Sequence, residues 1–122
     1  MSWLFVFLGG GLGSLARYGT AQLFPPVELS EGDFPWATLA ANILACIVLG
    51  VGLALLSKNA LSKPLQLFLL TGFCGGFSTF STYAAEILLL GEEGNSGAAL
   101  AYLALSIIGG IGALWLALVM VR

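Results

Sequence analysis

Apolar residues are gathered into four long runs, and short polar segments separate them. The runs are continuous and exceed the ~10 residues of an alternating membrane β-barrel strand. Each reaches the ~20 residues that a helix needs to cross a bilayer. Helices also satisfy their own backbone hydrogen bonds in lipid. The pattern predicts a single-domain, all-α integral membrane protein with four transmembrane helices, at about residues 2–24, 36–56, 65–90 and 98–121.

The polar segments predict how the chain is oriented. An even number of spans places both termini and the middle loop on the same side of the membrane. That side carries Lys58, Lys63 and Arg122, whereas the other loops carry no lysine or arginine. Because basic loops stay in the cytoplasm, we expect cytoplasmic termini and a multi-pass protein of the cell (inner) membrane.

Composition agrees with this class and excludes others. Hydrophobic residues make up 59% of the chain and charged residues 8%, against about 25% charged residues in soluble domains. No basic patch suggests nucleic acid. The chain has no histidine, and no cluster of metal ligands or catalytic groups is evident, so we predict that it is not an enzyme. Cys46 and Cys74 lie inside apolar runs and are interpreted as small apolar fillers.

The third run is interrupted by small and hydroxyl residues. Gly72, Gly75 and Gly76 weaken the helix. Nearby hydroxyl groups compete for backbone hydrogen bonds. We therefore predict that the third helix is broken at mid-membrane. On composition alone, close packing of helices through small residues is slightly favoured over an ion site built from freed backbone groups. The hydroxyl residues are Thr71, Ser78, Thr79, Ser81 and Thr82.

Four further polar residues lie inside the spans. Thr38 and Asn42 are four residues apart and share a helix face. An asparagine amide in lipid needs a partner, so Asn42 should face protein or water. Arg17 either lines an anion vestibule or extends toward the membrane interface. Glu86 either marks a pore mouth or lies at the interface, and no ion is assigned to it.

The segment Gly-Phe-Cys-Gly-Gly-Phe-Ser-Thr-Phe-Ser-Thr-Tyr at 72–83 closely resembles the Fluc fluoride-channel family, also called CrcB. Gly-Gly-x-Gly-Ser-x-x-Arg-Tyr at 10–18, Thr38 and Asn42 match as well, and the resemblance covers the whole chain. It implies a fluoride-selective channel that exports fluoride passively and lowers its cytoplasmic concentration.

The resemblance also implies an assembly. Family members form antiparallel, dual-topology dimers with a structural sodium ion at the centre. Backbone carbonyls at the third-helix breaks hold this ion, and the matching positions are Gly75 and Ser78. The unequal basic loops favour one fixed orientation. A homodimer is nevertheless our first expectation, and the fixed orientation makes a heterodimer with an oppositely oriented paralogue the alternative.

The residues implied for the fluoride pathway suit a small anion that holds its water tightly. Neutral donors can replace that water without trapping the ion, and aromatic ring edges carry partial positive charge. Tyr83 departs from the usual phenylalanine, so its effect on permeation stays open. The predicted pathway comprises Phe80, Tyr83, Asn42, Thr38, Ser81, Thr82 and Ser106, with Arg17 in the vestibule.

Two other functions remain as alternatives. A small four-helix drug/proton antiporter needs an acid inside the membrane, and only Glu86 could serve. A non-transporting membrane assembly subunit fits the generic composition, and it predicts that purified protein in liposomes carries no ion flux.

Overall fold

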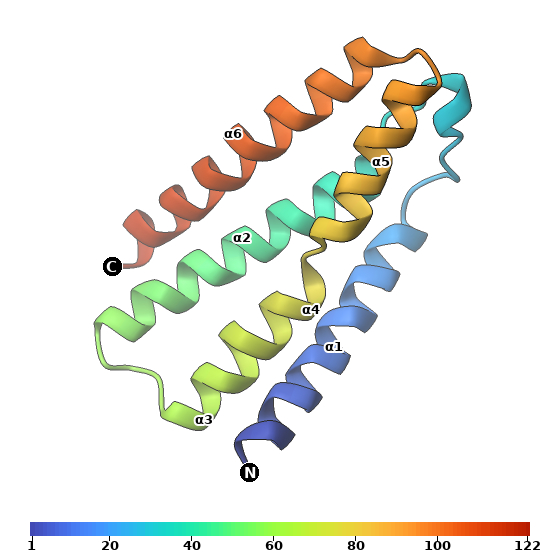
Figure 1. Cartoon of the computed structure of the whole chain (residues 1–122). Coiled ribbons are helices and arrows are strands. Elements are labelled where there is room, and N and C mark those ends of the chain that lie inside the picture. The colour runs from blue at the N-terminus through green and yellow to red at the C-terminus, as the bar shows by residue number, and fades with distance from the viewer.

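The computed structural model describes residues 1–122, and its regular structure is entirely helical (Figure 1). Four long helical segments follow one another, and the third consists of several shorter elements. The α1–α2 loop adds one turn, η1 (Leu29–Glu31). The first, second and fourth segments are α1 (Ser2–Gln22), α2 (Trp36–Ser57) and α6 (Ser96–Val121). The third consists of α3 (Lys63–Gln66), the π-helical η2 (Leu67–Cys74), α4 (Gly75–Phe77) and α5 (Phe80–Glu92).

Three of these segments are long and apolar enough to cross a membrane: Trp36–Ser57, Lys63–Glu92 and Ser96–Val121. These lengths and compositions fit a multi-pass membrane protein. Helix α1 has 21 residues but is not among the three, because Arg17 and several glycines lower its hydropathy. That α1 is a fourth span stays a prediction.

The helices run alternately up and down, so the two ends of the molecule differ (Figure 1). Both termini and the α2–α3 connection lie at one end, together with Lys58, Lys63 and Arg122. The α1–α2 loop and the α5–α6 turn lie at the other end. The carboxylates of this second end are Glu28, Glu31, Asp33, Glu92 and Glu93.

Helix α1 packs against η2 and α4, and glycine makes this approach possible. A methyl group at Gly13 would lie 2.8 Å from the Phe77 backbone nitrogen, and closer still to the Phe73 carbonyl oxygen. Gly76 in turn lies against the backbone of α1, whereas a methyl group at Gly75 would meet nothing within 4 Å. Small-residue packing therefore accounts for Gly76 and leaves Gly75 free for another role.

The α1–α2 loop is fastened to the α5–α6 turn. The Asn95 amide donates to the Leu29 carbonyl at 3.1 Å. The Asp33 carboxylate accepts from the Glu28 N–H at 3.0 Å and closes the loop on itself. The turn needs Gly32, whose φ of 80° is left-handed. These contacts hold the residues just before α2 in a defined position.

Candidate functional site

The helical path of the third segment is interrupted at Ser78 and Thr79. Their backbones are extended, with φ/ψ of −78°/157° and −148°/114°. Asn42 on α2 pairs with both backbone groups of Thr79. It accepts the Thr79 N–H through Oδ1 at 2.8 Å and donates through Nδ2 to the Thr79 carbonyl at 3.3 Å. One side chain therefore replaces the hydrogen bonds that the Thr79 peptide groups would make in a helix.

Hydroxyl side chains complete the interruption. Ser78 Oγ donates to the Cys74 carbonyl at 2.8 Å, and Thr79 Oγ1 accepts from the Thr82 N–H at 3.3 Å and so caps α5. In a continuous helix, the Thr79 and Thr82 amides would bond the carbonyls of Gly75 and Ser78. Because both amides donate to side chains here, those two carbonyls lose their helical donors. The expected competition between hydroxyls and backbone is confirmed at this point.

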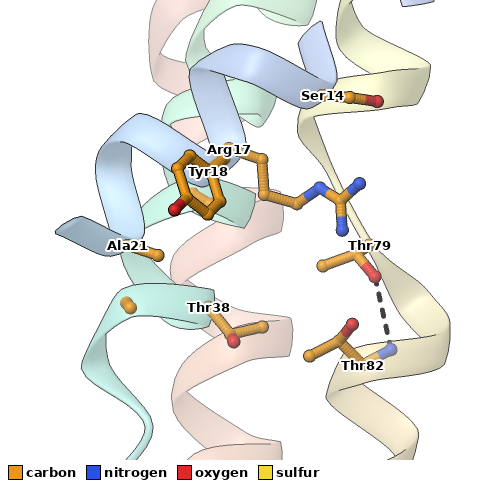
Figure 2. A pocket seen from close by; sticks show the side chains of 9 residues that line it. Ser14, Arg17, Tyr18, Ala21, Thr38, Thr79 and Thr82 are labelled. Atoms are coloured by element: carbon orange, nitrogen blue, oxygen red, sulfur yellow. Dashed lines mark hydrogen bonds between the residues drawn. The ribbon is translucent and has the colours of Figure 1, made fainter. Parts of the chain in front are cut away.

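A pocket of about 270 Å³ lies between α1, α2 and the interruption (Figure 2). Arg17 reaches from α1 toward Thr79, and its Nε donates to the Gly76 carbonyl at 3.2 Å. Arg17 thus lines a partly open pocket next to the interruption. The nine lining residues are Ser14, Arg17, Tyr18, Ala21, Ala37, Thr38, Ala41, Thr79 and Thr82.

A second pocket, of about 250 Å³, lies between the interruption, α2 and α6. Phe80 is 78% exposed, whereas Tyr83 is buried, and their ring centroids are 6.0 Å apart. Ser106 Oγ is buried without a hydrogen-bond partner. Thr79 lines this pocket as well as the first. The residues around it are Asn42, Cys46, Ser78, Thr79, Phe80, Tyr83, Ser106, Ile107 and Gly110.

Between them, the two pockets contain every residue predicted for the fluoride pathway and its vestibule but one. Ser81 is the exception, because it is exposed and lines neither pocket. Tyr83 uses its distinctive hydroxyl to donate to the Leu103 carbonyl at 3.4 Å, a contact between α5 and α6. The ring of Tyr83 therefore lines the pocket while its hydroxyl binds backbone.

Sequence reasoning missed one hydrogen-bonded group. The Glu86 carboxylate accepts from Thr38 Oγ1 at 3.1 Å and from the Tyr102 hydroxyl at 2.9 Å. Tyr102 is fully buried in the core and was not singled out. Two signals were available: a carboxylate within an apolar span and a tyrosine within another both require partners. The Thr38 hydroxyl binds Glu86 and not its own helix backbone.

Comparison with known proteins shows which family the chain belongs to. A family model described as "CrcB-like protein, Camphor Resistance (CrcB)" matches residues 4–118. A protein of Chlorobium phaeobacteroides named "Fluoride-specific ion channel FluC" is 45% identical over 115 residues, which cover 93% of this chain and 87% of that protein.

Two further relatives carry the same name. The protein of an Enterobacter species is 40% identical over 107 residues, covering 87% of this chain and 82% of its own. That of Flavobacterium psychrophilum is 37% identical over 119 residues, covering 97% and 94%. These names describe ion channels, which are not enzymes. A family match and relatives of this identity both extend over nearly the whole length, so the chain belongs to the CrcB family.

Proposed function

We propose that this protein is a fluoride-selective channel through which fluoride leaves the cell passively. The relatives named as fluoride-specific channels support the choice of ion. The observation that carries the proposal is the meeting of two pockets at Thr79, one containing Arg17 and the other the rings of Phe80 and Tyr83.

The chemistry of the two pockets suits a strongly hydrated anion. Arg17 attracts an anion into the first pocket, and its bond to the Gly76 carbonyl fixes the guanidinium in place. Beyond Arg17, neutral groups replace the water molecules that hydrate the ion, so no full charge traps it. The edges of Phe80 and Tyr83 carry partial positive charge, and the unpartnered Ser106 hydroxyl is available to donate. Thr38 and Thr82 line the entry, and Ser81, which is exposed in the single chain, stays a predicted donor of the pathway.

The pathway is completed by a second chain. Phe80 is 78% exposed in the single chain, and Gly75 and Ser78 are exposed beside it. We place four spans in the inner membrane, with the interruption at its centre and the two chains antiparallel. The homodimer remains the first choice, and an oppositely oriented paralogue is the alternative because the loop charges are unequal.

A structural sodium ion fits the interruption. The carbonyls of Gly75 and Ser78 are released from helical donors, because the Thr79 and Thr82 amides donate to Asn42 and Thr79 side chains. Carbonyl oxygens are hard ligands suited to a hard cation. Two such oxygens from each chain would hold the ion between the chains and stabilise their contact.

Fluoride efflux from liposomes that contain the purified protein tests the function. With valinomycin present so that potassium leaves too and balances the charge, wild type should release fluoride, and Phe80→Ile should release it roughly two- to tenfold more slowly, because the ring edge is lost. Phe7→Ile is the matched control, since Phe7 is also exposed but lies on α1 outside both pockets. Absence of fluoride release from correctly folded wild type would end the channel proposal.

A further inference from the structure

Two aromatic rings pack edge-to-face against the ring of Tyr102. Tyr83 approaches it with centroids 5.0 Å apart and ring planes at 74°. Phe34 approaches with centroids 5.4 Å apart and planes at 75°. Both are the edge-to-face arrangement that aromatic pairs prefer. With its hydroxyl on Glu86 and no exposed surface, the Tyr102 side chain has one defined orientation.

Phe34 is itself held by the loop that carries it. Its ring centroid lies 4.5 Å from that of Trp36, with the ring planes tilted by 40°, and its carbonyl accepts the Trp36 N–H at 2.9 Å. The following Pro35 is fully buried. Asn95 ties the same loop to the α5–α6 turn. Phe34 is therefore an anchored contact for Tyr102 that comes from outside the long helices.

A continuous chain of contacts leads from this loop to the first pocket. Phe34 contacts Tyr102, Tyr102 binds Glu86, and Glu86 binds Thr38, which lines the pocket beside Arg17. The carboxylate accepts from two hydroxyls, so displacement of the Tyr102 hydroxyl leaves Glu86 one donor short. Thr38 is then hydrogen-bonded to a Glu86 carboxylate whose side chain can rotate.

We propose that Phe34 is a positioning residue of the fluoride pathway, which acts through Tyr102 to fix Glu86 and Thr38 at the entry. This inference rests on the proposed channel function. Phe34 does not touch either pocket that contains Thr79, so its effect on fluoride passes through the Tyr102 ring.

A double-mutant cycle tests the inference. Phe34→Leu keeps an apolar side chain and removes the ring edge, and it should slow fluoride efflux roughly two- to tenfold, the range expected for one aromatic pair. Tyr102→Phe removes the hydroxyl through which Phe34 acts. In that background, Phe34→Leu should add no further loss, whereas a general loss of structure would slow efflux equally in both backgrounds.

Phe24→Leu is the control, because Phe24 is half-buried in the same loop region, beside Phe34, and has no ring contact with Tyr102. Its efflux should match wild type. If Phe34→Leu does not yield folded protein, Phe34→Met carries the same cycle. Equal efflux of wild type and Phe34→Leu, or equal losses in both backgrounds, overturns the inference.

A readout independent of flux separates the two proposals. Incorporated 3-fluorotyrosine gives three ¹⁹F resonances, one for each tyrosine of the chain. The Tyr102 resonance should move in Phe34→Leu and stay in place in Phe24→Leu. A shifted resonance with no fluoride efflux in wild type refutes the channel and leaves the contact standing. An unshifted resonance refutes the positioning role even where fluoride flows.

Discussion

Gly13→Ala should separate α1 from the third helical segment. The added methyl carbon would lie 2.8 Å from the Phe77 nitrogen and 3.0 Å from the Phe73 carbonyl carbon. Non-bonded atoms of this kind rest about 3.5–4.0 Å apart, and the Phe73 carbonyl oxygen lies nearer than either atom, so α1 must retreat by roughly 1 Å or more. The obstructing atoms are backbone, which cannot rotate away as a side chain can. Overpacking of this kind costs about 1–3 kcal/mol of unfolding free energy.

Gly11→Ala provides the matched control in the same helix. A methyl group at Gly11 meets nothing within 4 Å, so this variant carries only the gain in helix propensity, up to ~1 kcal/mol. Gly13→Ala carries that gain and the steric cost together. The difference between the two variants therefore isolates the steric cost.

Denaturant unfolding in detergent micelles, followed by the fluorescence of the three tryptophans, measures both variants. We expect Gly13→Ala to be less stable than Gly11→Ala by about 1–3 kcal/mol. Equal unfolding free energies for the two variants would show that α1 does not pack against backbone at Gly13.

Three further changes test the pockets. Asn42→Ala leaves the N–H and the carbonyl of Thr79 without hydrogen-bond partners, and it should lower the unfolding free energy by about 1–3 kcal/mol, measured in the same micelles. Stability equal to wild type contradicts the pairing. Tyr83→Phe keeps the ring and loses one long bond of 3.4 Å, so fluoride efflux should change less than about twofold; a larger change would mean that the hydroxyl itself contacts the ion. Arg17→Gln keeps a donor near the Gly76 carbonyl but removes the charge, so efflux should fall most at low ionic strength, where attraction is least screened; an equal loss at all salt concentrations refutes the electrostatic role.

The sequence predicts the helices well because lipid leaves the chain few alternatives. Long apolar runs must become helices, and α2, the third segment and α6 lie close to their expected bounds. Several residues of the motif at 72–83 line the two pockets. Helix α1 falls short of the apolar character of the other three segments because of Arg17 and its glycines, and its assignment as a span stays a prediction.

The partners of the polar residues could not be predicted, because they depend on how helices are rotated against one another. Asn42 was known to need a partner, but nothing local in the sequence pairs it with the peptide of Thr79. Glu86 and Tyr102 are 16 residues apart on different helices, and their bond exists only once α5 packs against α6. Ser81 is predicted as a neutral donor of the pathway, and in the structure it is exposed and lines neither pocket.

The unequal distribution of charge between the two ends of the bundle has an electrical consequence. Three basic side chains lie at one end and five carboxylates at the other, so each chain is a dipole aligned with its helices. In two copies that lie side by side and antiparallel, the dipoles cancel. An ion that crosses in either direction then meets the same sequence of groups. Such a pair should carry equal current at positive and negative voltage, whereas a pair of unlike chains should rectify.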